Sequence, residues 1–105
     1  MNDEMLEKLN EDSMQIIMKA GDARDFLTKS FLKLKEKDSD GFNNLVEEAH
    51  KCLIEAHRLQ TKCIQDQIEE NINLYSILFS HAQDTLMTIN SEYEMTKRIS
   101  LLFLD

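Results

Sequence analysis

Apolar residues recur every three or four positions along this chain, in three long segments separated by short polar stretches. This spacing places them on one face of an α-helix. It predicts one helix over about residues 3–36, a second that begins within the turn KEKDSDGF (35–42), and a third over about residues 74–103. Short connections between long helices favour an antiparallel up-down-up arrangement. The predicted fold class is all-α, a three-helix bundle.

The apolar and small residues of each seam are expected to form the core. In the first helix they are Leu6, Leu9, Ser13, Ile16, Ala20, Ala23, Leu27, Ser30 and Leu34. In the second helix they are Phe42, Leu45, Ala49, Cys52, Ala56, Leu59 and Cys63. In the third helix they are Leu78, Ala82, Thr85 or Leu86, Ile89, Tyr93, Thr96, Ile99 or Ser100, and Phe103.

The ends of the helices are less clear than their faces. Gly21 costs about 1 kcal/mol relative to alanine inside a helix. Either the first helix breaks there and Asp22 caps a new one, or the glycine lets another backbone come close, and the unbroken seam favours a continuous helix. Ser39 or Asp40 is expected to cap the second helix. The predicted cap of the third helix is an asparagine of EENINL, Asn71 or Asn73.

A second stripe of mostly apolar or uncharged residues accompanies the seam on each helix, and a three-helix monomer cannot bury both. On the second helix it contains Val46, His50, Leu53, His57, Gln60 and Ile64. On the third helix it contains Leu74, Ile77, His81, Asp84, Thr88 and Met95. We therefore expect a homo-oligomer that covers these stripes.

Composition limits the remaining possibilities. The 105 residues predict one domain, 1–105, and the absence of proline together with only two glycines favours long helices. The net charge of −8 argues against nucleic acid or an anionic membrane as a partner. There is no run of about 18 apolar residues to span a membrane. An acidic start and two unpaired cysteines, Cys52 and Cys63, predict a cytoplasmic protein with reduced thiols and no signal peptide.

His81 and Asp84 are the most informative candidates for chemistry. They lie one turn apart on the second stripe of the third helix. A histidine at a helix interface is often inert, and an aspartate on a bundle rim is often solvated. In a cyclic oligomer with the third helix near its axis, however, one Asp84 per subunit would gather, and Mg²⁺ takes such oxygen ligands. His50 and His57 give only a weak metal signal, because zinc sites on helices usually use histidines four residues apart.

Three stretches, taken together and in order, carry a resemblance to a known family. AGDAR (20–24), EAHRLQT (55–61) and HAQDTLMT (81–88) resemble the lactose/cellobiose-type enzyme IIA of the bacterial phosphoenolpyruvate–sugar phosphotransferase system. The resemblance covers nearly the whole chain. It implies a three-helix protomer in a homotrimer, acting as a phosphohistidine carrier within the phosphotransferase system and not as a stand-alone enzyme.

The resemblance also assigns roles to residues. His81 would accept a phosphoryl group from HPr and pass it to a cysteine of enzyme IIB, for uptake of a β-disaccharide such as cellobiose, lactose or chitobiose. Asp84 and its two symmetry mates would hold one Mg²⁺ per trimer. Thr85 stands where relatives often carry a second histidine, and we expect transfer to survive this difference. The alternatives are an adaptor bundle without chemistry and a metal-binding protein using His50, His57 and carboxylates.

Overall fold

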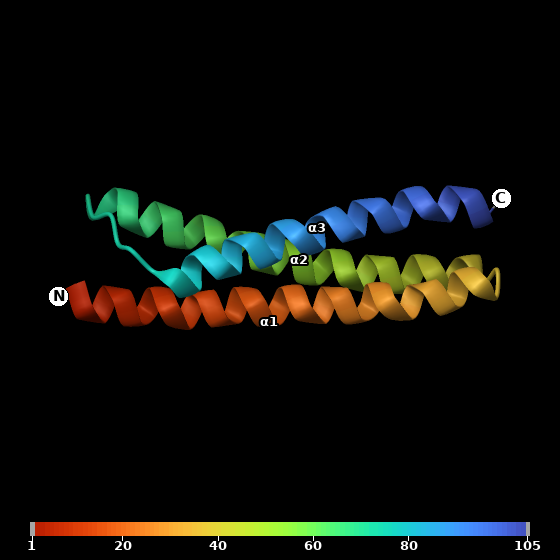
Figure 1. The fold of residues 1–105 in the computed structure, drawn as a ribbon, viewed down its shortest axis with the longest axis horizontal. Coiled ribbons are helices and arrows are strands. Elements are labelled where there is room, and N and C mark those ends of the chain that lie inside the picture. Colours follow the sequence, from red (N-terminus) through yellow and green to blue (C-terminus); the bar gives the residue numbers. More distant parts are fainter. Residues whose placement is uncertain (1, 105) are drawn as a thin grey trace.

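The computed structural model describes residues 2–104 and confirms the all-α three-helix bundle. Helix α1 covers Asn2–Lys35, α2 covers Ser39–Glu69 and α3 covers Ile77–Phe103. The helices run up, down and up, and the molecule measures 55 × 18 × 17 Å (Figure 1). α1 makes the most extensive contacts, first with α2 and then with α3, whereas α2 and α3 touch each other least. The bundle is therefore long and narrow, with α1 as its central element.

Helix α1 is continuous through Gly21, as the unbroken seam predicts. Nothing lies within 4 Å of the Cβ that another residue would carry there, so no backbone of the same chain requires the glycine. The seam itself is confirmed, since all of its members are buried except Leu6, which is half-buried. The two serines in it satisfy their hydroxyls locally. Ser13 donates to the carbonyl of Leu9 and Ser30 to that of Leu27, each at 2.6 Å.

The turn between α1 and α2 is closed by the backbone of Lys37 and the side chain of Asp38. Lys37 has a left-handed backbone conformation (φ 59°), and its N–H donates to the carbonyl of Leu34. The N–H of Asp38 donates to the carbonyl of Lys33. Together these two bonds form the Schellman motif that ends α1. Asp38 then caps α2 by accepting the Gly41 N–H at 2.9 Å. The predicted caps Ser39 and Asp40 are wrong, because both residues already lie inside the helix.

The end of α2 has the same design. Asn71 is left-handed (φ 53°), its N–H bonds to the carbonyl of Ile68, and the N–H of Ile72 bonds to that of Gln67. Asparagine tolerates this conformation better than most residues. Asn71 therefore ends α2 and does not begin α3, which contradicts its predicted role.

Helix α3 starts three residues later than predicted, at Ile77. Ser76 is its cap and accepts the N–H of Phe79 at 3.0 Å. Asn73 and Leu74 belong to the irregular connection between the helices. The three–four spacing of apolar residues continues from Leu74 through this connection into α3. The spacing therefore does not indicate the residue at which the helix begins.

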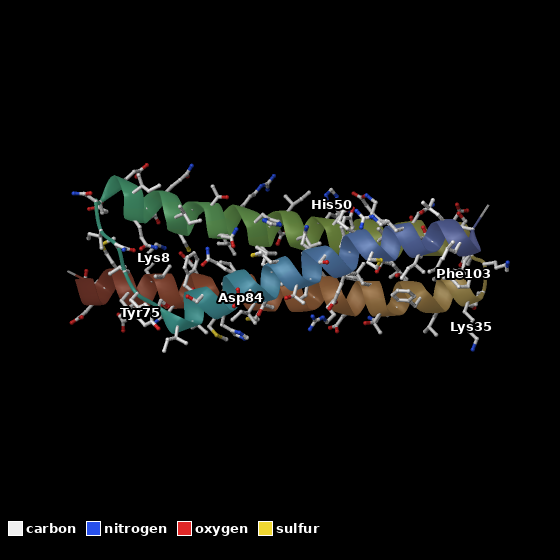
Figure 2. All side chains as sticks on the ribbon, turned by 45° about the horizontal axis from the view of Figure 1, so that its top comes forward. Lys8, Lys35, His50, Tyr75, Asp84 and Phe103 are labelled. Carbon is white, nitrogen blue, oxygen red and sulfur yellow. The ribbon has the colours of Figure 1, made fainter. Side chains whose placement is uncertain are left out.

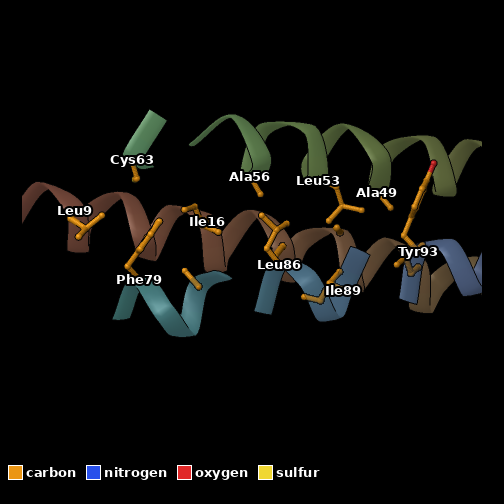
Figure 3. Close-up of a cluster of buried hydrophobic side chains, with 14 residues drawn as sticks. Leu9, Ile16, Ala49, Leu53, Ala56, Cys63, Phe79, Leu86, Ile89 and Tyr93 are labelled. Atoms are coloured by element: carbon orange, nitrogen blue, oxygen red, sulfur yellow. The ribbon is translucent and has the colours of Figure 1, made fainter. Parts of the chain in front are cut away.

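The core agrees with the predicted seams in most places. The predicted members Leu45, Cys52, Leu59 and Leu78 are only half-buried, and Leu53, Phe79 and Phe103 depart further from the prediction. Leu53 was placed on the outer stripe of α2, yet it is only 1 % exposed and belongs to the same buried cluster as Ile16, Leu86 and Ile89 (Figure 3). Because α2 packs against two helices, its buried face is wider than one seam. Phe79 is buried although it was not predicted to be, and Phe103, on the last turn of α3, is 51 % exposed.

Replacing Leu53 by alanine tests this correction. We expect the free energy of unfolding to fall by about 2–5 kcal/mol, the usual cost of truncating a fully buried leucine. Cys52→Ala removes a half-buried neighbour from the predicted seam and is the control, with a smaller expected loss. Urea unfolding of both variants measures the difference. Equal losses would contradict the observed orientation of α2.

Met1 and Asp105, the ends of the predicted domain 1–105, lie outside the described residues. Among residues 2–104, no helix combines the length and the apolar character that crossing a lipid bilayer requires.

Candidate functional site

The backbone that carries His81 is held in place from both other helices. Just before α3, the N–H of Leu74 donates to Oε1 of Gln67 on α2 at 2.9 Å. The hydroxyl of Ser76 donates to Oδ1 of Asn10 on α1 at 2.6 Å. These bonds fix the first turn of α3 against the bundle, and His81 follows one turn later.

His81 and Asp84 lie on the exposed side of α3, away from the buried Ala82 and Leu86 (Figure 2 labels Asp84). Neither side chain has an ion-pair partner among residues 2–104. The imidazole is therefore open to an approaching molecule, while its helix is fixed by the capped first turn.

The stripe on which they lie is exposed along most of α3. Its exposed members are Ile77, His81, Asp84, Thr88 and Met95. Leu74, predicted to belong to it, instead packs against the core because it precedes the helix. The stripe is thus a face that the chain does not cover itself.

Apolar and charged side chains both lie near His81 on α3. Ile77, one turn before it on the same side of the helix, is 73 % exposed, and the carboxylate of Asp84 follows one turn after it. Asn10 of α1 contacts Ser76, 66 residues later, and Arg24 of α1 contacts Glu92 of α3, 68 residues later. Residues of the parallel helices α1 and α3 that lie at one height therefore differ by about 67 in number, so His81 is level with about residue 14. At that level α1 exposes Met14 and, one turn on, Met18.

One chain does not form the predicted metal site. No group of three or more His, Cys, Asp or Glu side chains that could hold a metal ion occurs among residues 2–104. Asp84 contributes a single carboxylate, so a metal there requires carboxylates from other copies.

The other two histidines have different surroundings. His50 lies on α2 where this helix meets α3 (Figure 2). Its ring stacks on that of Tyr93, with centroids 5.4 Å apart and an interplanar angle of 12°. His57 is exposed. The metal alternative built on His50, His57 and carboxylates finds no ligand cluster in the described chain.

The AGDAR stretch has a structural role that the sequence did not reveal. Arg24 donates two hydrogen bonds to the carboxylate of Glu92, at 2.9 and 2.8 Å, and so ties α1 to α3. Ala20 and Ala23 are fully buried and let the helices approach. No local signal pointed to the ion pair, because its partners are 68 residues apart.

Both cysteines are free thiols, as their predicted separation of about 16 Å along one helix requires. Cys63 is buried, and Cys52 is half-buried. Burial raises the pKa of the Cys63 thiol to about 11, and the carboxylate of Asp12, 3.9 Å from its sulfur, raises it as well. The neutral thiol is thus the form that the folded protein favours.

This shift predicts a loss of stability in alkali. An unfolded thiol ionises near pH 9.0, whereas the folded one stays protonated to about 11. Between these pH values, ionisation of the thiol lowers the free energy of the unfolded state relative to the folded state as the pH rises. Below pH 9 the thiol contributes nothing to the pH dependence. We expect it to remove up to about 2 kcal/mol of unfolding free energy by pH 11. Urea unfolding of wild type and Cys63→Ala between pH 8 and 11 measures this, and identical pH profiles would contradict it.

Taken together, these features define a small helical protein whose candidate chemistry lies on its surface, on the exposed side of a capped helix. The family described as "PTS system, Lactose/Cellobiose specific IIA subunit" matches residues 11–103. The chain belongs to this family.

Individual relatives agree with the family match. A lactose-specific EIIA component of Staphylococcus epidermidis is 33% identical over 100 residues, covering 90% of this chain and 96% of that protein. An oligo-beta-mannoside-specific EIIA component of Bacillus subtilis is 32% identical over 91 residues, covering 87% and 83%. The crystal structure of the cellobiose-specific enzyme IIA of Bacillus anthracis superposes with a TM-score of 0.81 at 27% identity, covering 89% and 85%.

Membership defines the general activity. The chain is a IIA component, a phosphotransferase subunit that carries phosphoryl groups in sugar uptake. Components of this kind work together with a phosphocarrier protein and a IIB component.

Proposed function

We propose that His81 is the phosphoryl carrier, loaded by phospho-HPr and unloaded onto a cysteine of enzyme IIB. The observation that carries this proposal is the position of the imidazole. His81 heads the HAQD stretch of a family IIA component, on a capped helix, exposed and without an ion-pair partner among residues 2–104. Such a side chain can meet two different proteins in turn.

The chemistry requires little besides this imidazole. A lone pair of neutral His81 attacks phosphorus in line, one N–P bond forms as the donor's N–P bond breaks, and the donor leaves as neutral imidazole. In the second step a thiolate of IIB attacks, an S–P bond forms, and His81 leaves with a proton on its other nitrogen. The exposed apolar side chain of Ile77, one turn from His81, suits contact with a docked protein.

The assembly we propose is a homotrimer in which the exposed stripe of α3 lies at the subunit interface, with His81 at the edge of that interface and open to the donor and the acceptor. The members of the stripe follow the three–four spacing of a coiled-coil seam and include large apolar side chains that would otherwise remain in water. With α3 near a threefold axis, the three copies of Asp84 come together.

Three such carboxylates fit one Mg²⁺ ion per trimer. Carboxylate oxygens are the ligands that this hard cation prefers, and Asp84 is exposed and unpaired by any cation among residues 2–104. When bound, the ion would offset the repulsion of the three charges. The residues of the chain itself carry out the phosphoryl chemistry.

The sugar is proposed from the relatives. Their names give lactose, cellobiose and oligo-beta-mannoside, which supports a β-linked disaccharide or short oligosaccharide for the system that this chain serves. We further propose that the protein acts in the cytoplasm, where phospho-HPr is available.

Labelling tests the proposal. Incubation with phosphoenolpyruvate, enzyme I and HPr should give acid-labile, base-stable phosphate, and peptide mass spectrometry should locate the added phosphoryl group on His81. A phosphoryl group located on another residue would overturn the assignment. Complete absence of labelling would favour the adaptor alternative.

A further inference from the structure

The EAHRLQT stretch places polar residues on the surface that the fold itself does not need. Ala56 is its fully buried member, whereas His57, Arg58 and Thr61 are exposed on α2. The three line a shallow hollow of about 380 Å³, whose remaining lining residues are Ile54, Lys62 and Gln65. We call this hollow the α2 patch. Its chemistry is that of hydrogen-bond donors and cations on an otherwise acidic protein.

The α2 patch lies at the same level along the bundle as His81. The stacked rings of His50 and Tyr93 fix the register of the antiparallel helices α2 and α3. Arg58 lies eight residues after His50 on α2, and Thr85 lies eight residues before Tyr93 on α3, so Arg58 and Thr85 are at the same height. Three residues further along, Thr61 is level with Ala82. The patch therefore spans the turn of α3 that carries the HAQD stretch.

Contacts with α1 give the same register independently. Lys19 pairs with Glu55 at 2.8 Å, and Asp12 lies 3.9 Å from the sulfur of Cys63. Interpolation between these two contacts puts residue 61 of α2 at the height of about residue 14 of α1. The contacts between α1 and α3 put His81 at the height of the same residue. Two separate sets of contacts thus place the patch and the imidazole at one height.

A phosphoryl group on His81 finds no cation within the neighbouring turns of its own helix. Residues 77–96 of α3 contain no lysine or arginine, and the nearest charged side chain of its stripe is the carboxylate of Asp84. A dianionic group beside a carboxylate needs donors or cations to offset the repulsion. These must come from another element or another copy.

Arg58 is the cation in the patch that is free to do this. Lys62 is held by Asp66 at 2.9 Å and by Asp12 at 3.7 Å, whereas Arg58 has no ion-pair partner within residues 2–104. The planar guanidinium matches phosphoryl oxygens and can donate two hydrogen bonds to them.

We infer that the α2 patch of one subunit faces His81 of the neighbouring subunit and that Arg58 binds the oxygens of its phosphoryl group. Within one chain, Arg58 and His81 both point away from the shared core. Rotation about a threefold axis parallel to the long bundle keeps each residue at its height, so it brings one subunit's patch level with the next subunit's imidazole. This inference rests on the proposed phosphocarrier function and trimer, and it adds a binding residue supplied in trans.

The first experiment measures rates of phosphorylation by phospho-HPr. Arg58→Gln is expected to slow the reaction about tenfold to a hundredfold at saturating donor, as loss of one charge-assisted hydrogen bond to an oxyanion does. Arg58→Lys should recover part of the rate. Lys51→Gln is the matched control, since Lys51 is an exposed cation of α2 that pairs with Glu48 far from the level of His81, and it should behave as wild type. Circular dichroism confirms that each variant is folded.

The second experiment distinguishes neighbouring subunits. Arg58→Gln and His81→Ala chains are co-expressed with different tags, and mixed trimers are purified through both tags. In a cyclic trimer, the intact His81 sites are those of the Arg58→Gln chains, and about half or more of them then face a His81→Ala neighbour that still carries Arg58. These sites should react at the wild-type rate. A normal rate for Arg58→Gln, or mixed trimers that react only at its slow rate, would overturn the inference while leaving His81 as carrier. A wild-type chain that takes up no phosphoryl group would overturn both proposals.

Discussion

His81→Ala is expected to abolish phosphoryl uptake without changing the fold. The side chain is exposed on α3 and has no ion-pair partner among residues 2–104, so its removal leaves no cavity and no unpaired buried group. The reaction, by contrast, loses its only nucleophile at this position. We expect labelling by phosphoenolpyruvate, enzyme I and HPr to fall below detection, and the melting temperature to stay within a few degrees of wild type.

His50→Gln is the control for this loss. His50 is also an imidazole on the bundle, but it is stacked on Tyr93 and half-buried. Its replacement should retain labelling, at some cost in stability from the lost stacking. Undiminished labelling of His81→Ala would refute the carrier assignment, and so would a loss of labelling in His50→Gln with the fold intact.

Asp84→Leu is expected to remove the dependence of the trimer on metal. In the proposed trimer three carboxylates meet at the axis, and without a cation their repulsion opposes assembly. Chelator should therefore raise the dissociation constant of wild type about tenfold or more, corresponding to at least about 1.4 kcal/mol. Leucine replaces the clustered charge by apolar contact, and the variant should remain a trimer with or without chelator. Analytical ultracentrifugation over a range of concentrations measures both.

Glu94→Leu is the matched control for Asp84→Leu. Glu94 is another exposed carboxylate of α3, outside the stripe. The Glu94→Leu substitution removes the same charge and introduces the same side chain, yet the dissociation constant of this variant should still rise when chelator is added. A monomeric Asp84→Leu protein would refute the proposed position of Asp84, and a chelator-insensitive wild type would refute the shared metal.

The sequence predicted the helices better than their ends. The seam of α1 was correct because a three–four repeat of apolar and small residues has only one helical face to occupy. The caps were wrong because each segment offers several candidates of the same type. Asp38, Ser39 and Asp40 are adjacent, and the left-handed turn at Lys37 selects among them.

The candidate site shows the same division. The sequence alone placed His81 and Asp84 one turn apart on a largely uncharged stripe, and three stretches, HAQDTLMT among them, carried the resemblance to the family. It also placed Leu53 on an outer stripe of α2, because period alone cannot show how many neighbours a helix has. In the bundle α2 packs against both other helices, and Leu53 lies between them.

By itself, then, the sequence determined the all-α class, the faces of the helices and the identity of the candidate imidazole, since these depend on spacing within one segment. Only the tertiary structure decided which residues from different segments share a level. The Arg24–Glu92 ion pair, the Ser76–Asn10 bond that fixes the start of α3, and the alignment of Arg58 with His81 all depend on how the helices slide along one another. That register is set by side chains meeting across the bundle, and no local pattern in a single helix contains it.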